Sequence, residues 1–327
     1  MIQKLMDIME HGWNRWRWRN TSSARVVPRT IVEISSRFLS LARSKGRPAR
    51  VVGFAARELP QGLVRPSPFR SNLANPESLS KILHSAIEEL NEDLNESALL
   101  IPDLAVRVGT LHAESLPRKQ SELEPYLLWR MRETLPFSPN DATLSYRVRN
   151  SPEGLEVLVI AIQQSVLREY ESLLESLGLT PVLALPASLS LLPIVPEESS
   201  FPTMLVHRDG RSLTCAVPEN DILSFYRCRQ LDKEALDVKN WTESIAVEVL
   251  PLLSHWKSKQ GTQIRKIAFS EQGELKKEAL HCLRERLGLS VHPLDFRKRL
   301  SKDCPSQAGD LFSQLGAPVA GLLENAE

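Results

Sequence analysis

The sequence lacks the features that mark a membrane-spanning or disulfide-bonded chain. Its 327 residues contain no uninterrupted apolar run of about 18 residues, the length that a transmembrane helix needs. The four cysteines, Cys215, Cys228, Cys282 and Cys304, form no C-x-x-C pair, and the first residues do not match a signal peptide. A reduced, cytoplasmic chain is therefore expected.

Catalytic motifs are also absent. The sequence contains no G-x-S-x-G elbow, no G-x-x-x-x-G-K-[ST] phosphate loop and no H-E-x-x-H zinc motif. His207 and the nearest other histidine, His255, do not have the spacing of zinc ligands. The residues therefore predict no catalytic group and no metal site.

An excess of one charge is missing too. Lys plus Arg number 41 against 40 for Asp plus Glu, so no global field favours nucleic acid or anionic lipid. The hydrophobic fraction of 42% and the charged fraction of 25% are ordinary for a globular protein. The length allows about two domains.

Glycine is missing from a turn that interrupts the apolar stretch 31–42, IVEISSRFLSLA. A turn that binds phosphate exposes successive backbone N–H groups to the anion, and the closest turns need Gly. Here the tip is Ser35, Ser36, Arg37 and Phe38, which offers hydroxyls and one cation but also a large aromatic side chain. The function depends on whether this turn still binds a nucleotide.

The hydrophobic pattern predicts a mixed α/β protein. Strands at 31–42 and 49–59 precede a helix capped by Asn75, and strands and helices then follow one another up to a helix that ends at Gly178. A second unit begins near residue 201, after a Pro-rich and acidic linker.

The second unit begins with a pattern that looks like a weak repeat of the first hairpin. Its strands are expected at 204–217 and 222–229, with polar turns between them. A short buried strand is expected at 264–269, and a final helix at 311–323.

The first 20 residues combine apolar side chains at helical spacing with Trp16 and Trp18 set among arginines. Three interpretations stay open: a helix docked on the protein or a partner, a segment on a membrane surface, or a disordered arm. Single-stranded nucleic acid is disfavoured, because three arginines make no wider basic face.

A family resemblance appears in residues 127–146, LLWRMRETLPFSPNDATLSY. This stretch resembles the one that characterises PilM, the actin-like cytoplasmic component of type IV pilus assembly. Ile101-Pro-Asp103 and the stretches 167–192 and 317–323 resemble further PilM segments in the same order. FtsA and the cytoplasmic part of GspL share the broader resemblance.

The resemblance implies an α/β protein with the actin-like ATPase fold, in which two duplicated ribonuclease-H-like domains carry an inserted small α/β subdomain. It divides the chain into an arm at 1–29, a first domain at 30–200 with the insertion at about 98–165, and a second domain at 201–327. The final helix, 311–323, is expected to pack back on the first domain.

Actin-like ATPases hold the phosphates between two hairpins, each beginning with an Asp that is followed two residues later by a Gly. The resemblance assigns these places to Glu33 and Ser35 in the first hairpin, with Ser40 where PilM usually has Lys. In the second hairpin it assigns them to His207 and Asp209, although the register around Gly210 is open by one residue. In the simpler structural interpretation, Glu33 pairs with Arg37 or Arg43, and His207 is a hydrogen-bonded histidine at the edge of the core.

The adenosine turn is expected at 270–274, SEQGE, which has one Gly and two carboxylates. A carboxylate near phosphate in a partly desolvated cleft costs on the order of kcal/mol. We therefore expect a degenerate nucleotide cleft at Glu33, Ser35, Ser36, Asp209 and Gly210. ATP hydrolysis is not expected. No cofactor is expected either, because binding of ATP and Mg²⁺ is disfavoured. The alternative is an ATP-binding actin-like protein whose assembly is regulated by nucleotide.

PilM-like proteins resemble adaptors that recruit the short cytoplasmic N-terminus of a PilN-like inner-membrane protein. This implies a peptide site within 104–148, between the first domain and the insertion, with Trp129, Arg130 and Tyr146 as candidate anchors. A core position for Trp129 and sheet pairing for Tyr146 are the alternatives.

The resemblance leaves open whether the apparatus is a pilus or a type II secretion machine, and it allows a homo-oligomer. The chain is expected to lie in the cytoplasm at the periphery of the inner membrane. Any membrane contact would be indirect or through residues 1–20.

Overall fold

The computed structural model describes residues 27–90, 95–151, 154–197, 201–219, 222–231, 238–273 and 277–324. Residues 1–26, which make up nearly all of the predicted N-terminal arm, lie outside the described residues. None of the helices in the described part of the chain combines the length and the apolar character that crossing a membrane requires.

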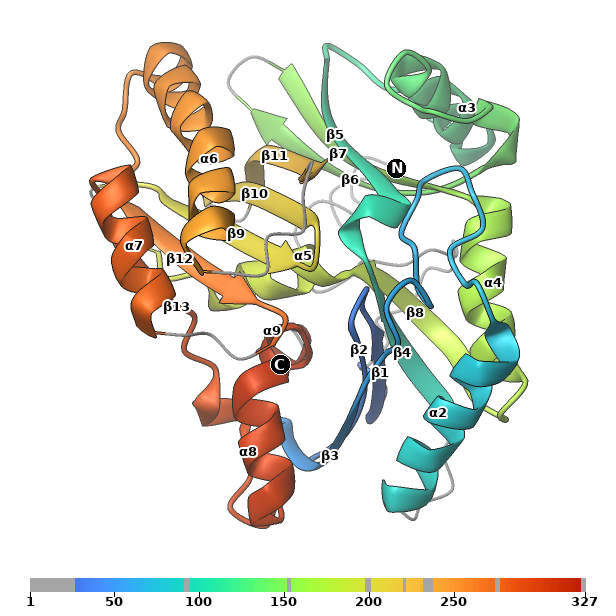
Figure 1. Ribbon diagram of the computed structural model, residues 1–327. Helices are drawn as coiled ribbons and strands as arrows, with labels where there is room; N and C mark the ends of the chain where they lie inside the picture. The colour runs from blue at the N-terminus through green and yellow to red at the C-terminus, as the bar shows by residue number, and fades with distance from the viewer. Residues whose placement is uncertain are drawn as a thin grey trace.

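The first domain is built on a five-stranded sheet in the order β3-β2-β1-β4-β8 (Figure 1). The first three strands form an antiparallel meander, and β4 and β8 run parallel to β1. The strands are β1 (Thr30–Ile34), β2 (Phe38–Lys45), β3 (Arg50–Glu58), β4 (Glu96–Ile101) and β8 (Thr180–Pro186).

Helices α2 (Pro76–Leu90) and α4 (Gln164–Glu175) lie side by side along the first sheet (Figure 1). The side chain of Asn75 accepts a hydrogen bond from the N–H of Ser78 at 3.0 Å, which confirms the predicted N-cap of α2.

The second domain repeats this arrangement with the order β11-β10-β9-β12-β13. Strands β9, β10 and β11 form the antiparallel meander, and β12 and β13 run parallel to β9. The repeat that the sequence shows only weakly is therefore exact in strand order and direction. The strands are β9 (Thr203–Asp209), β10 (Ser212–Glu219), β11 (Ile222–Gln230), β12 (Lys266–Glu271) and β13 (Ser290–Pro293).

Side chains on the two faces of the second sheet enter different cores, because neighbouring residues of a strand point to opposite faces. Met204 and Val206 pack with α6 (Val238–Gln260) and α7 (Lys277–Leu287), whereas Leu205 joins the core of the first domain. Both faces of this sheet are therefore buried, one in a core of the second domain alone and the other in a core that contains residues of both domains.

A smaller unit is inserted between β4 and α4. The short helix η1 (Asp103–Ala105) leads into a three-stranded antiparallel sheet of order β5-β7-β6. Because β4 belongs to the first sheet, the insertion begins after Ile101, and the expected start near residue 98 falls inside that sheet. The other elements of the insertion are β5 (Val106–Ala113), α3 (Gln120–Met131), η2 (Pro139–Asp141), β6 (Ala142–Ser151) and β7 (Gly154–Gln163).

The predicted final helix at 311–323 is wrong as a single element. The chain forms two helices, α8 (Ser306–Leu315) and α9 (Ala317–Glu324), with a break at Gly316. Gly316 lies directly against the ring of Phe312, and Pro318 has no N–H to continue a helix from α8. Pro318 is instead tolerated in the first turn of α9.

The C-terminal helices pack against the first domain. Helix α8 contacts β3, and α9 contacts β1, η3 (Leu192–Ile194) and the short helix α5 (Ala187–Leu191). Arg299, in η4 (Arg297–Arg299), pairs with Glu324 and donates to the carbonyl of Ala49. The end of the second domain thus ties the two domains together.

Candidate functional site

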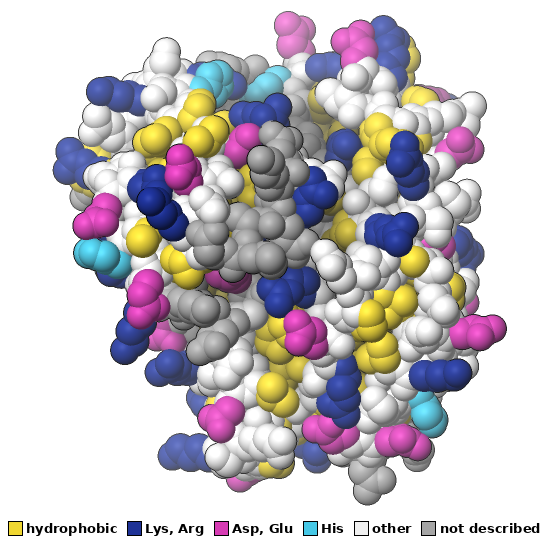
Figure 2. Space-filling model, viewed as in Figure 1, with side chains coloured by type: hydrophobic (Ala, Val, Ile, Leu, Met, Phe, Trp, Pro, Cys, Tyr) yellow, Lys and Arg dark blue, Asp and Glu magenta, His cyan; other side chains and the backbone are white. Residues whose placement is uncertain are grey.

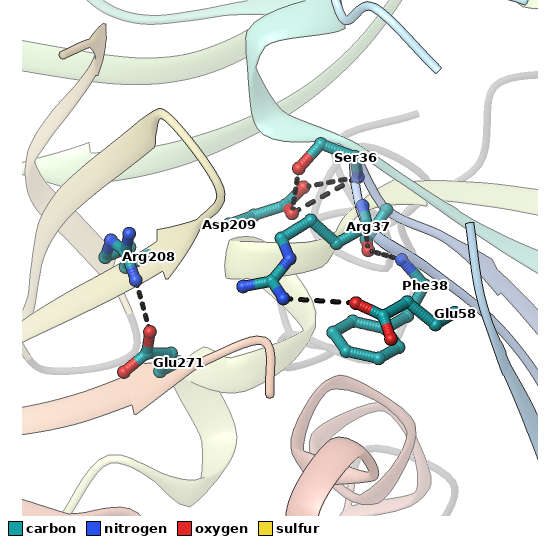
Figure 3. A network of polar contacts seen from close by, with 8 residues as sticks. Ser36, Arg37, Phe38, Glu58, Arg208, Asp209 and Glu271 are labelled. Atoms are coloured by element: carbon teal, nitrogen blue, oxygen red, sulfur yellow. Dashed lines mark hydrogen bonds and ion pairs between the residues drawn. The ribbon is translucent and has the colours of Figure 1, made fainter. Parts of the chain in front are cut away.

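The two hairpin turns that would face a nucleotide touch each other (Figure 3). The backbone N–H of Ser36 donates to both carboxylate oxygens of Asp209, at 3.2 and 3.1 Å, and the Ser36 hydroxyl donates to one of them at 2.6 Å. Gly210 has a φ of +56° and lies so close to the Ser36 hydroxyl that a Cβ there would collide with it. The contact therefore needs glycine at position 210 both for its backbone conformation and for the close approach.

Ser35 stabilises its own turn. Its hydroxyl accepts hydrogen bonds from the N–H groups of Arg37, at 3.2 Å, and Phe38, at 2.8 Å. These are the amides that a phosphate-binding turn would offer to an anion. A serine replaces glycine here by holding the turn with its side chain, a local hydrogen-bonding pattern typical of this residue.

Glu33 is bonded across the domains. Gln272, in the loop after β12, donates its side-chain N–H to Glu33, and Ser40 donates to the other carboxyl oxygen at 3.4 Å. Of the two arginines named in the simpler interpretation of Glu33, Arg37 pairs with Glu58 at 3.3 Å on the surface instead. Arg43 donates a hydrogen bond to the carbonyl of Leu90 at 3.5 Å.

Phe38 occupies the gap beside the third loop. A Cβ added to Gly273 would lie 3.6 Å from the Phe38 ring, so the ring packs against the loop where the adenosine turn was expected. The guanidinium of Arg37 lies 5.5 Å from the centroid of the same ring. The last residue of the expected adenosine turn, position 274, lies outside the described residues.

Asp103 makes a third link between the domains, which the sequence pattern does not predict. Its carboxylate accepts a hydrogen bond from Thr214 of β10 at 2.6 Å and one from the N–H of Ser188 at 3.0 Å. The hydroxyls of Ser188 and Tyr226 lie 3.3 Å apart beside it. Asp103 belongs to the motif that resembles PilM, but no local pattern shows that it reaches residues more than 80 positions away.

Burial controls the electrostatics of this cleft. Desolvation raises the pKa of Glu33 well above its ordinary range, and the nearby Asp209 raises it further. Desolvation also raises the pKa of Asp209 and of Asp103, against the opposing effect of their hydrogen bonds. Burial lowers the pKa of His207 to about 4, so this histidine is neutral at neutral pH.

The nearest arginine of β9 points away from the cleft. Arg208 pairs with Glu271, and its guanidinium lies 4.8 Å from the ring centroid of Trp241 on α6. Figure 3 shows this pair apart from Ser36 and Asp209. The alternation of side chains along β9 explains the separation, because His207 and Asp209 share one face and Arg208 lies on the other.

His207 is hydrogen-bonded, as the simpler interpretation expected: its Nδ1 lies 3.1 Å from the Ser270 hydroxyl. Its Nε2 is buried and has no hydrogen-bond partner. Within the described residues, no group of three or more His, Cys, Asp and Glu side chains is arranged to hold a metal ion.

The candidate peptide anchors lie on the inserted unit. Trp129 is 53% exposed on α3, so the alternative of a core position is wrong. Arg130 donates to the hydroxyl of Tyr126 at 2.8 Å and to the carbonyl of His112 at 2.9 Å. Tyr146 is half-buried in β6 and packs with the core beneath α3, where desolvation raises its pKa.

The surface around Trp129 is hollowed. Arg132 stacks over the Trp129 ring, with its guanidinium 4.7 Å from the centroid. The hollow has a volume of about 400 Å³ and is lined by Pro125, Leu128, Trp129, Arg132, Pro139, Asn140 and Ala142. Ala142 begins β6, so the hollow adjoins the edge strand of the small sheet. Among the described residues, no strand pairs with the outer edge of β6.

This surface faces away from the first domain. The small sheet presents Val157, Val159 and Ala161 to α3, while Leu158, Ile160 and Ile162 pack into the core of the first domain. Trp129 and Arg130 therefore lie on the far side of the small sheet from the first domain. On the face of the molecule shown in Figure 2, positive and negative side chains are interspersed.

Comparisons with known proteins define the fold. No family model and no curated protein matches the sequence. Among solved structures, a Bacteroides thetaiotaomicron protein described as having an actin-like ATPase fold and unknown function is similar with 11% identity and a TM-score of 0.50, over 86% of this chain and 94% of that one. The ethanolamine utilization protein EutJ from Carboxydothermus hydrogenoformans is similar with 9% identity and a TM-score of 0.51, over 98% and 96%. The chain has the actin-like ATPase fold.

A chain of a structure described as "PilM-PilN type IV pilus biogenesis complex" is much more similar. It shares 17% identity with a TM-score of 0.77 and covers 93% of this chain and 100% of its own length. The resemblance to PilM that the sequence indicates is thus confirmed at the level of the fold.

Proposed function

We propose that this protein is a cytoplasmic adaptor in the assembly platform of a type IV pilus or a type II secretion machine, and that it does not hydrolyse ATP. The contact between Ser36 and Asp209 carries the proposal, because it joins the two turns that hold phosphates in an actin-like ATPase. The fold similarity to a PilM chain from a pilus complex supports the choice of apparatus.

The same contacts oppose nucleotide binding. An entering phosphate would displace the bonds of Ser36 to Asp209 and would meet the buried carboxyls of Asp209 and Glu33. Taking a charged phosphate out of water into this buried space costs on the order of several kcal/mol unless the phosphate is paired and hydrogen-bonded. The N–H groups of Arg37 and Phe38, which could offset this cost, already donate to Ser35.

The proposed partner is the short cytoplasmic N-terminus of a PilN-like bitopic inner-membrane protein. The outer edge of β6 offers backbone groups to an extended peptide, and the adjoining hollow beside Trp129 offers a place for one apolar side chain. Exposed Trp with a stacked Arg is typical of the residues that supply most of the binding energy at interfaces. The adaptor would thereby be held at the periphery of the inner membrane.

A peptide titration tests this proposal. The probe is a synthetic peptide with the N-terminal sequence of the bitopic membrane protein encoded beside this chain, added to the full-length protein in a calorimeter. We expect saturable binding that Trp129→Ala weakens at least tenfold. Phe69→Ala is the matched control, since Phe69 is 47% exposed but lies on the first domain. Failure of every such peptide to bind would contradict the adaptor function. Equal losses of affinity in both variants would show that Trp129 is not part of the binding site.

A further inference from the structure

Two short basic segments, 43–50 and 297–303, lie side by side although they are far apart in the sequence. Arg299 donates to the carbonyl of Ala49, 250 positions away, at 3.2 Å, and the N–H of Ser301 donates to a carbonyl at the start of β3 at 2.9 Å. Together the segments hold eight Lys and Arg residues but only one acidic residue. The near balance of 41 basic and 40 acidic residues in the whole chain therefore hides a local excess of positive charge.

Five exposed side chains of these segments form a surface that we call the basic face. They are Lys45, Arg47, Arg50, Arg297 and Lys302. The first three lie at the turn between β2 and β3, and the last two lie on either side of Arg299 in the sequence. The other three basic residues are engaged elsewhere, since Lys298 and Arg299 pair with Glu324, and Arg43 donates to a backbone carbonyl of α2.

No acidic side chain of the described residues forms an ion pair with a member of the basic face. Two carboxylates flank the second segment, and each accepts a hydrogen bond from its own loop. Asp295 accepts from the N–H of Arg297 at 3.3 Å, and Asp303 accepts from the Ser301 hydroxyl at 3.4 Å. The charges of the basic face are therefore left to attract an anionic partner.

The adjoining N-terminal sequence favours a lipid bilayer as this partner. The carbonyl of Arg29 accepts a hydrogen bond from the N–H of Ser44 at 2.8 Å, directly before Lys45. The chain thus enters its described part beside the basic face. Residues 1–26 contain three tryptophans set among arginines, and both side chains suit a membrane interface. Stable attachment to a bilayer usually takes two such signals, of which a basic patch is one.

A single-stranded nucleic acid fits this surface less well. Proteins that bind one combine a basic groove with aromatic side chains on which the bases stack. Neither basic segment contains an aromatic residue. Phe69 and Trp129, which are exposed, lie on other elements.

We propose that the basic face binds the headgroups of an anionic lipid bilayer and thereby brings the protein itself to the membrane surface. Figure 1 shows β3 and α8, which border this face, at the end of the molecule opposite the inserted unit. A bilayer on the basic face therefore leaves the surface around Trp129 accessible to a peptide. Lipid binding does not depend on the proposed adaptor function, so the two are tested separately.

Co-sedimentation of the full chain with lipid vesicles tests this proposal. The vesicles consist of phosphatidylcholine, either alone or with about 30% phosphatidylglycerol to supply negative charge. Each Lys or Arg near an anionic bilayer contributes a factor of about five to the partition coefficient, so removal of two should lower it about 25-fold. The test variant combines Lys45→Gln with Lys302→Gln, one from each segment. The matched control combines Lys257→Gln with Lys259→Gln, which removes the same charge from exposed positions at the end of α6.

The wild type and the control should bind equally, only to the anionic vesicles, and should be released as the salt concentration rises from about 0.1 M to about 0.5 M. Absence of binding to the anionic vesicles, or equal losses in the two double variants, would overturn the proposal. A DNA duplex is titrated in parallel. If the protein binds the duplex more tightly than the vesicles, with the same loss in the test variant, the face binds nucleic acid and the proposal is wrong. Thermal melts check that each variant is folded.

Discussion

The close approach of Gly210 to Ser36 allows a double-mutant cycle that tests the contact between the two hairpin turns. In Gly210→Ala the residue must keep a φ near +56°, which costs an L-residue with a Cβ about 1–2 kcal/mol. The new methyl group also collides with the Ser36 hydroxyl, which must rotate away and lose its bond to Asp209, at about 1–3 kcal/mol. We therefore expect a total loss of about 2–5 kcal/mol in the free energy of unfolding.

The second substitution separates the two effects. Ser36→Ala alone removes the hydroxyl and should cost about 1–3 kcal/mol. Added to Gly210→Ala, it should cost almost nothing further, because the bond is already broken and the collision disappears. The assay is urea unfolding. If the unfolding free energy of each variant depends on urea concentration with the same slope, a shift of the midpoint reports a change in stability. Additive losses in the double variant would show that the two turns do not touch, since additivity is the behaviour of independent sites.

Three further predictions follow from packing. Trp129→Ala should change stability by less than about 1 kcal/mol because the side chain is half-exposed, whereas Trp256→Ala, at 4% exposure, should cost about 3–5 kcal/mol in the same thermal melts. Gly321→Ala should lower the free energy of unfolding by about 3 kcal/mol or more, because the backbone carbonyl of Ser190 lies where the Cβ would be. Gly261→Ala meets open space and should cost only about 1–2 kcal/mol, which comes from its positive φ. Equal losses in the two variants would contradict this packing. Asn75→Ala should lower stability by about 1 kcal/mol through loss of the α2 cap, and an unchanged melting temperature would refute the capping role.

Local patterns in the sequence were enough to predict most of the secondary structure. The cap at Asn75, the apolar residues of β9 and β10, and the Asp209-Gly210 turn between them each follow from the residues nearby. The break between α8 and α9 was missed because apolar spacing continues through it. Gly316 and Pro318 could have indicated the break.

The contacts across the cleft could not be predicted in the same way. Ser36 and Asp209 are 173 positions apart, and Glu33 and Gln272 are 239 apart. The sequence identified Glu33 and Asp209 only as departures from a nucleotide-binding pattern, and Ser36 as part of the turn beside Glu33. That Ser36 bonds to Asp209 and Gln272 to Glu33 depends on how the two domains meet, which local patterns do not encode. Gln272 and Asp103 were missed for the same reason.

For Trp129, the local sequence pattern allowed two different positions. Its spacing on α3 suited both a core position and an exposed anchor, because Leu127, Leu128 and Met131 lie close by in sequence. The structure places Leu127 and Met131 inward and leaves Trp129 half-exposed. Whether this surface binds a peptide stays a prediction.

The central claim is that the cleft of this actin-like protein is closed by its own side chains and holds no nucleotide. Isothermal titration of the full chain with Mg-ATP at neutral pH tests it most directly. We predict no saturable heat at millimolar nucleotide from a sample whose thermal melt shows that it is folded. Saturable binding with a micromolar dissociation constant would contradict it and would favour an ATP-binding actin-like protein instead.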